Sequence, residues 1–450
     1  MLGFDTIGNA TLVVYDGEPL LATDPWIQGD AYFGSWGLSH AIPAEQFEAI
    51  RKAPFVWLSH GHPDHISLAS IDHFFGAQIL LADHCGARVR ADLEGMGLRV
   101  RVLPDREWVA LSPRVKIFTM ADENQDSILL VDVGGRLVIN LNDASPKLGE
   151  RVIRPIARQY PHSYLLRLWG YGDADMINLW DETGRPIPSK PRDSASLSGW
   201  VQADTIRFQA KTAIPFSSFH RYQRADSVWA NERTTPLADF YRSADPAKPP
   251  ILPAFLRVDC ESGRIEELNP PLIKGAVKSP EEFGDSPHDP LDREDQRNLQ
   301  AYFERKESLR DHFGFLRFRV GGKDTTVDLN PKLREAGFSF EVPRHSLMTA
   351  IQYRVFDDLL IGNFMRTTLH GGARLYPHFT PFVSKYGDNG KAETKEELRA
   401  YFGHYRRKDS LGYALAALRG NSEQMVRRFV GRETPVFKAV KRVYWKMMKA

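Results

Sequence analysis

The sequence predicts an α/β fold, in which short buried strands are followed by helices. Two apolar runs, 11–15 and 20–23, flank an Asp16-Gly17 turn and predict a hairpin. The apolar run 54–58 is short enough for a buried strand, and apolar residues at helical spacing follow it over 66–75. A strand that leads directly into a helix places the intervening loop at one end of the sheet.

The same alternation continues through the first half of the chain. Apolar runs and periodicities predict strands over 78–82, 115–120, 127–133, 136–141, 163–168 and 213–219, and helices over 44–52, 85–96, 148–159 and 201–211. Gly134-Gly135 provides the turn of a second hairpin. Positions 170–198 are polar and rich in Gly, Pro, Asp and Ser, which indicates a loop or an insertion.

A dense set of metal-ligand side chains follows the strand at 54–58: Ser59-His60-Gly61-His62-Pro63-Asp64-His65. A strand-to-helix loop can direct these side chains into one pocket. Neutral imidazole and carboxylate are preferred ligands of borderline divalent metals. Four such ligands crowd one ion but serve two, with His60 and His62 on one and Asp64 and His65 on the other. The alternative is a polar helix cap whose histidines face solvent.

The bulk composition sets broad limits on the protein class. A length of 450 residues suggests two or three domains, and 42% apolar residues are ordinary for a soluble globular protein. The net charge of +2 gives no indication of nucleic-acid binding. Two cysteines form no disulfide framework, and neither a signal-peptide pattern nor a membrane-spanning run is present in the sequence, so a cytoplasmic location is expected.

The chain changes character after the first half. We expect a metal domain over 1–246, a Pro-rich linker or wrapping segment over 247–298, and a smaller α+β region over 299–450. In the last region, helices are expected over 299–313 and 346–356 and strands over 315–320, 325–329 and 339–342. Its final segment, 435–450, is a basic amphipathic helix in this interpretation. Such a helix suits a membrane surface or an acidic partner, or it docks on its own domain.

The His-x-His-x-Asp-His pattern resembles the signature of the metallo-β-lactamase fold. The resemblance implies an αββα sandwich with the metal site at the edges of its sheets. It also implies that Asp143 bridges two metals, that His220 is the last ligand, and that Asp24 lies behind the histidines and holds one tautomer. For Asp24, a turn residue before Pro25 is an equal alternative. The fold hosts hydrolases, lactonases, nucleases and di-iron oxygenases, so it does not determine the reaction.

One ligand position of that fold lacks its usual histidine in this chain. Asp122 or Glu123 must replace it, or the site has one ligand fewer; alternatively these acids belong only to a turn. A carboxylate in place of imidazole hardens the site and favours iron or manganese over zinc. Asp64 and Asp143 are the carboxylates we expect to take part in catalysis.

An aromatic loop follows the first hairpin and contains Trp26, Tyr32 and Trp36. These side chains either form the wall of a substrate pocket or cover one end of the core. Together with other segments, the loop resembles the CMP-N-acetylneuraminate hydroxylase family. The shared pieces are Asp24-Pro25-Trp26, positions 59–65, Asp126-Ser127 with Asn142-Asp143, Pro215-Phe216 with Asp226, and Asp357-Asp358-Leu359-Leu360-Ile361-Gly362.

This closer resemblance implies a di-iron oxygenase that hydroxylates the N-acetyl group of a nucleotide sugar. The family's Rieske-type Cys-x-His and Cys-x-x-His pairs are missing from this sequence, so electrons are expected from a separate ferredoxin or Rieske protein. The alternative enzyme is a dinuclear metallohydrolase with two zinc or manganese ions, acting on a lactone, an amide or a phosphodiester. A third interpretation is a degenerate scaffold that only binds a partner or a membrane.

Overall fold

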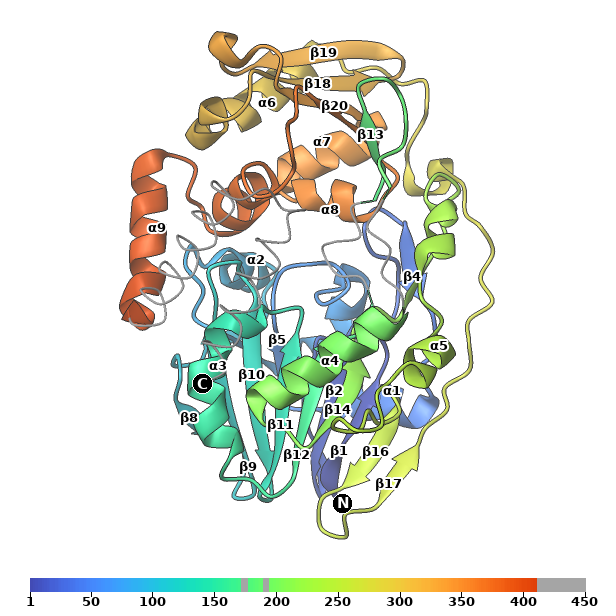
Figure 1. Cartoon of the computed structure of the whole chain (residues 1–450), viewed down its shortest axis with the longest axis vertical. Helices are drawn as coiled ribbons and strands as arrows, with labels where there is room; N and C mark the ends of the chain where they lie inside the picture. Colours follow the sequence, from blue (N-terminus) through green and yellow to red (C-terminus); the bar gives the residue numbers. More distant parts are fainter. Residues whose placement is uncertain (171–176, 189–193, 411–450) are drawn as a thin grey trace, which may run out of the picture. The chain divides into compact units, whose positions relative to one another are not determined.

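The computed structural model describes residues 1–170, 177–188 and 194–410 of the chain (Figure 1). Met1–Tyr401 forms one compact unit. The expected basic helix at 435–450 lies outside the described residues. Within the described ranges, every helix is too short or too polar to cross a lipid bilayer.

The first sheet has eight strands in the order β17-β16-β1-β2-β3-β5-β6-β7. Its strands are β1 (Leu2–Ile7), β2 (Thr11–Asp16), β3 (Glu18–Thr23), β5 (Phe55–Leu58), β6 (Gln78–Leu81), β7 (Arg99–Val102), β16 (Leu256–Asp259) and β17 (Ile265–Glu267). The strands from β3 to β7 are parallel, and the others pair antiparallel. The hairpin predicted over 11–23 is formed by β2 and β3.

The second sheet has six strands in the order β14-β12-β11-β10-β9-β8. Its strands are β8 (Trp108–Ala110), β9 (Val115–Ala121), β10 (Ser127–Val133), β11 (Arg136–Asn142), β12 (Ser163–Leu168) and β14 (Thr212–Phe216). The helices of this half of the chain are α1 (Ala44–Lys52), η1 (Leu68–Phe74), α2 (Arg88–Gly95), α3 (Pro146–Ala157), α4 (Ser194–Phe208), η3 (Val228–Arg233) and α5 (Leu237–Arg242).

Both sheets are buried on both faces, and alternate residues of each strand enter different cores. In β5, Trp57 joins the core between the two sheets, whereas Val56 packs on the helix side with Ile50 of α1. In β10, Leu129 faces the core between the sheets and Leu130 faces the side of α3 and α4. Strands buried on both faces appear as continuous apolar runs, which explains why they were predictable. The layers are therefore helix, sheet, sheet and helix, the αββα sandwich of the metallo-β-lactamase fold.

A third sheet of five strands combines strands of the C-terminal half with β13, which lies in the segment 170–198 that was expected to be a loop or an insertion. Its order is β13-β21-β20-β18-β19. The strands are β13 (Leu179–Asp181), β18 (Phe315–Val320), β19 (Lys323–Asp328), β20 (Gly337–Glu341) and β21 (Arg366–His370). The helices are η4 (Pro280–Phe283), α6 (Arg293–Glu304), η5 (Glu307–Asp311), η6 (Pro331–Leu333), α7 (Arg344–Tyr353), α8 (Phe356–Ile361), the π-helix η7 (Pro381–Asn389) and α9 (Lys395–Lys408).

The segment 247–298 packs against the rest of the compact unit Met1–Tyr401 and contributes strands to it. Two of its strands, β16 and β17, extend the first sheet through the pairing of β16 with β1. The guanidinium of Arg257 in β16 donates to both carboxylate oxygens of Asp5 in β1, at 2.8 and 2.7 Å. Further along, the Asp285 carboxylate forms a 2.7 Å ion pair with the buried guanidinium of Arg224. These contacts fix the segment against the sandwich.

Candidate metal centre

The motif loop lies at the carboxyl end of β5, a strand in the interior of the first sheet between β3 and β6. It turns back on itself, because the backbone carbonyl of His62 accepts hydrogen bonds from the N–H groups of His65 and Ile66, at 3.0 and 2.9 Å. The Ser59 carbonyl also accepts a 2.5 Å hydrogen bond from Ser127 at the start of β10 in the second sheet. The loop is therefore held from both sheets.

His60 and His62 direct one ring nitrogen each at the other. Nε2 of His60 lies 2.9 Å from Nδ1 of His62. The opposite nitrogens are occupied, since Nδ1 of His60 contacts the Ser59 hydroxyl at 2.9 Å and Nε2 of His62 contacts Oδ2 of Asp357 at 3.2 Å. Burial lowers the pKa of His60 well below its usual value. Burial also opposes protonation of His62, but Asp357 outweighs it and raises the pKa of His62 to about 9.

Asp64, His65 and Asp143 form the other half of the centre. Nε2 of His65 lies 3.3 Å from Oδ2 of Asp64 and 3.6 Å from Oδ2 of Asp143. These separations exceed those of well-formed hydrogen bonds, so the atoms converge without binding one another closely. Asp64 is held in place because its Oδ1 accepts from the Tyr32 hydroxyl at 2.6 Å and its Oδ2 accepts from the Asn9 amide at 2.9 Å.

Asp24 lies directly behind His65, where the fold resemblance placed it. Its Oδ2 is 3.3 Å from Nδ1 of His65, and its Oδ1 accepts from the Ser59 backbone N–H at 2.7 Å. The Asn142 amide donates to the same Oδ2 at 2.7 Å. Partners of this kind fix the orientation and tautomer of a metal-ligating histidine. Burial opposes the charged form of His65, but the carboxylates of Asp64, Asp143 and Asp24 outweigh it and raise its pKa well above the usual value.

Asp143 reaches the centre from the end of β11 in the second sheet. Asn142 has a positive φ of 48°, which ends the strand and turns the next side chain toward the motif loop. Oδ1 of Asp143 accepts from the Ser217 hydroxyl at 3.1 Å, while Oδ2 lies 4.0 Å from Nε2 of His60 and 3.6 Å from Nε2 of His65. Asp143 thus faces histidines from both halves of the motif, as a bridging ligand must.

His220 begins the short strand β15 (His220–Tyr222), which pairs with β4 (Trp36–Leu38). Its imidazole stacks on the Trp36 indole with ring centroids 3.4 Å apart and planes 1° from parallel. Burial lowers the pKa of His220 to about 3, against the opposing charges of Asp64 and Asp143. The ring is therefore neutral, the form that binds metals, and lies within electrostatic reach of two carboxylates of the centre. Its role as a metal ligand stays a prediction.

The Asp122 side chain forms hydrogen bonds within its own turn. Its Oδ1 accepts from the backbone N–H groups of Asn124 and Asp126, at 2.8 and 3.1 Å, which is an Asx-type turn. Burial and the charge of Asp126 raise its pKa to about 8. The neighbouring Glu123 accepts from the Tyr401 hydroxyl at 2.6 Å through its backbone carbonyl. Among the described residues, neither acid belongs to a group of converging metal-ligand atoms.

The aromatic loop is buried at the boundary between the sandwich and the third sheet. Trp26, Tyr32 and Trp36 share one core with side chains of α6, α7 and α8. They therefore cover one end of the core, and Tyr32 and Trp36 also touch Asp64 and His220. Their suggested role in substrate binding stays a prediction.

Several residues of the centre carry no local sequence signal. Two groups of metal-ligand atoms converge within 4.8 Å in the described residues, namely His60, His65 and Asp143, and His62, Asp357 and Asp358. Asp357 and Asp358 start α8, which follows the motif by nearly three hundred positions. Asn9 was missed, because a single Asn before a strand is common. Asn142, Asp357 and Asp358 were recognised only within segments that resemble the CMP-N-acetylneuraminate hydroxylase family, without a role at the metal centre.

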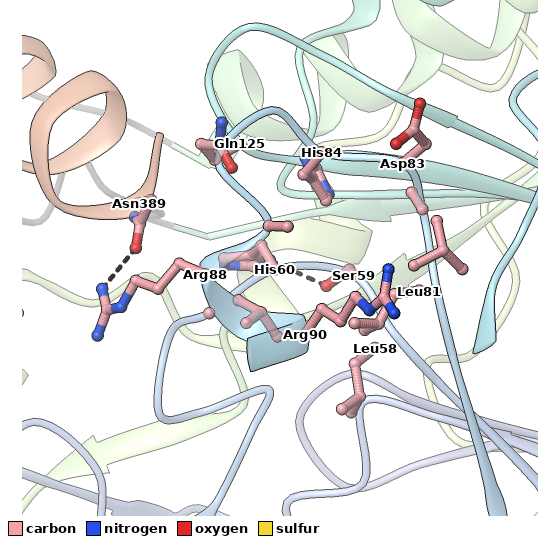
Figure 2. Close-up of a pocket in the computed structure, with 15 residues that line it drawn as sticks. Leu58, Ser59, His60, Leu81, Asp83, His84, Arg88, Arg90, Gln125 and Asn389 are labelled. Atoms are coloured by element: carbon pink, nitrogen blue, oxygen red, sulfur yellow. Dashed lines mark hydrogen bonds between the residues drawn. The ribbon is translucent and has the colours of Figure 1, made fainter. Parts of the chain in front are cut away.

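A small cavity lies beside His60. It has a volume of about 100 Å³ and is lined by 15 residues, among them His60, His84, Arg88, Arg90 and Gln125 (Figure 2). Figure 2 shows the Arg88 side chain reaching away from His60 to Asn389, with which it forms a 2.6 Å hydrogen bond. The volume is well below the roughly 300–1,000 Å³ of pockets for drug-sized ligands. In this conformation the cavity accommodates only small molecules.

The donor set fits a pair of metal ions. Imidazole nitrogens of His60, His62 and His65 and carboxylates of Asp64 and Asp143 converge from one loop and one strand end. The loosely spaced atoms around His65 are suited to an ion between them, and the ring nitrogens of His60 and His62, now at a hydrogen-bond distance of 2.9 Å, could each turn a lone pair to a second ion. The centre is therefore a candidate site for two neighbouring metal ions.

Comparison with known proteins gave partial matches. No protein-family model matches the chain. Part of the chain is similar to cytidine monophosphate-N-acetylneuraminic acid hydroxylases, with 24% identity over 165 residues for the protein of Danio rerio and 25% over 150 residues for that of Mus musculus. These matches cover 35% and 31% of this chain and 27% and 26% of the relatives. The matched part thus spans about a quarter of the length of these relatives.

Solved structures that are similar to the chain include both hydrolases and hydroxylases. A metallo hydrolase of Ignicoccus hospitalis has a TM-score of 0.36 and 14% identity, covering 57% of this chain and 97% of its own. CmlA, a diiron β-hydroxylase of Streptomyces venezuelae, has a TM-score of 0.37 and 12% identity, covering 59% of this chain and 54% of its own.

Proposed function

We propose that the protein is a di-iron oxygenase that hydroxylates an unactivated C–H bond, with the N-acetyl group of a nucleotide sugar as its substrate. The carboxylate-rich centre carries this proposal. Asp64 and Asp143 converge with three imidazoles, and two more carboxylates, Asp357 and Asp358, adjoin His62. Oxygen donors favour harder metals such as iron and manganese over zinc. The likeness to N-acetylneuraminic acid hydroxylases supports the choice of substrate class.

Hydrogen bonds and packing around the centre hold its ligands in place and limit their contact with water. Tyr32 and Asn9 fix both oxygens of Asp64, and Ser217 fixes one oxygen of Asp143. The Trp36 indole covers one face of His220 and is 3% exposed. Such preorganisation and exclusion of water favour oxidative chemistry because side reactions with solvent are suppressed. Two reduced iron ions held here would supply the activation of dioxygen.

The reaction requires a reductant. One hydroxylation places one atom of dioxygen in the C–H bond and reduces the other atom to water, which consumes two electrons and two protons. Cys85 and Cys260 are the two cysteines of this chain, and neither stands in the Cys-x-His or Cys-x-x-His pair of a Rieske cluster. We therefore assign the electrons to a separate donor, a ferredoxin or a Rieske protein.

The proposal is tested by metal analysis followed by an oxygen-dependent assay. Protein purified without added metal should contain iron in excess of zinc. With ferredoxin, its reductase and isotopically labelled dioxygen, it should convert cytidine monophosphate-N-acetylneuraminic acid or another N-acetyl nucleotide sugar into a product that contains the label. A matched sample stripped by a chelator should be inactive and recover on addition of ferrous iron.

Two results would contradict this function. Product formed equally well without reductant or without oxygen would exclude the oxygenase. Zinc in the purified protein, together with turnover of a lactone, an amide or a phosphodiester, would establish the hydrolase alternative.

A further inference from the structure

The first turn of α8 brings two buried carboxylates to the metal centre. His62, Asp357 and Asp358 each offer one ligand atom, and these atoms all lie within 4.8 Å of one another. Asp357 is 5% exposed and Asp358 is 8% exposed. The two acids come from the C-terminal half, whereas His62 belongs to the motif loop of the sandwich.

Asp357 determines which nitrogen of His62 is available. Its Oδ2 lies 3.2 Å from Nε2 of His62, so that nitrogen carries the proton and donates it. In the neutral imidazole, the form that binds a metal, Nδ1 then keeps its lone pair, and this atom faces Nε2 of His60 at 2.9 Å. A carboxylate behind a ligating histidine commonly orients the ring and increases its basicity as a ligand. Asp357 is thus a positioning residue for His62.

Asp358 is the second acid of this group. It is 8% exposed, and one of its carboxylate oxygens lies within 4.8 Å of ligand atoms of both His62 and Asp357. Two neighbouring carboxylates repel each other unless a cation lies beside them. The Asp358 carboxylate is therefore close enough to the motif to bind the same ion as His62.

The basic side chain of Arg88, whose charge acts on Asp358, forms its hydrogen bonds with other groups. The Arg88 guanidinium donates to the Asn389 amide oxygen at 2.6 Å and to the backbone carbonyls of Arg354 and Tyr353 at 2.9 and 2.8 Å. Five carboxylates lie beside the three histidines of the motif: Asp24, Asp64, Asp143, Asp357 and Asp358.

We propose that α8 completes the metal centre, with Asp358 as the carboxylate ligand of the ion held by His60 and His62 and Asp357 as the residue that orients His62. Asp358 would then fill the position for which the sequence suggested Asp122 or Glu123. Asp122 uses its Oδ1 for two backbone hydrogen bonds within its own turn, and neither Asp122 nor Glu123 belongs to a group of converging metal-ligand atoms in the described residues. This inference rests on the dinuclear centre of the proposed function.

The inference is tested by metal stoichiometry, which does not require turnover. The wild-type protein should bind two ions per chain, and Asp358→Asn should bind one, because Asn removes the charge with little change of shape. Asp357→Asn should still bind two ions at saturation but with affinity reduced about 10–100-fold, as for other residues behind metal ligands. Asp324→Asn, on exposed β19, is the matched control and should bind two ions with wild-type affinity.

Two ions in Asp358→Asn with wild-type affinity would overturn the inference. If that variant does not fold, the crystal structure of the metal-loaded wild-type protein shows whether Asp358 binds an ion. An Asp358 oxygen about 2.0–2.2 Å from an ion supports the ligand role, and a distance beyond bonding contradicts it. The proposed function fails separately: wild-type protein with two ions but no oxygen-dependent product contradicts the oxygenase and leaves the role of α8 intact.

Discussion

Replacing His65 by alanine should remove at least one metal ion and reduce activity by more than about 100-fold. Loss of a residue behind a metal ligand alone costs about 10–100-fold in affinity or activity, and loss of the ligand itself should cost at least as much. The His65 imidazole is fully buried, and its Nε2 faces two carboxylates at 3.3 and 3.6 Å. The measurement is metal content per chain, with turnover in the reconstituted assay.

His288→Ala provides the control for that variant. His288 is an exposed histidine in the segment that wraps the sandwich, outside both groups of metal-ligand atoms. This control should keep two ions and wild-type turnover. Full metal content and activity in His65→Ala would show that the motif does not hold the ions.

Replacing Lys306 by methionine should lower the free energy of unfolding by about 3–5 kcal/mol, the usual cost of leaving a buried charge without its partner. The Lys306 ammonium lies 2.8 Å from Oδ1 of Asp388, and both side chains are 1% exposed. Asp388 also accepts from the Tyr302 hydroxyl at 2.6 Å, so its carboxylate is fixed in the core of the C-terminal half. Chemical denaturation of both proteins measures the difference.

Lys395→Met is the matched control for this stability effect. Lys395 pairs with Asp311 at 2.8 Å, but the two side chains are 48% and 50% exposed. An exposed pair contributes about 0–1 kcal/mol, so the control should unfold close to wild type. A loss of less than 1 kcal/mol in Lys306→Met would contradict the importance of the buried pair.

Local patterns predicted much of the fold because the information lay within short stretches. The motif side chains converge since they occupy one loop of seven positions after β5. The predicted helix over 44–52 matches α1, and the hairpin predicted over 127–141 is formed by β10 and β11. The helix predicted over 66–75 is a 3₁₀ helix, η1, because apolar periodicity does not distinguish these tight turns from an α-helix.

Long-range pairings were not predictable from local patterns. The strand β1 contains Asp5, which interrupts its apolar run and forms its ion pair with Arg257, 252 positions away. In the same way, Asp357 meets His62 across 295 positions. Prolines in 247–298 suggested a linker or a wrapping segment, but gave no indication that β16 in this segment pairs with β1. In the sequence, the polar residues that follow Asp122 were the indication that this acid belongs to a turn.

The central claim is that one centre holds two metal ions. The most direct measurement is anomalous diffraction at the iron absorption edge, from crystals of protein purified without added metal. We expect two peaks about 3.5–4 Å apart, the spacing of other two-metal sites. One peak should lie next to His60 and His62 and the other next to Asp64 and His65, with Asp143 beside both. A single peak, or no peak while Asp143 points away from the histidines, would contradict a dinuclear centre.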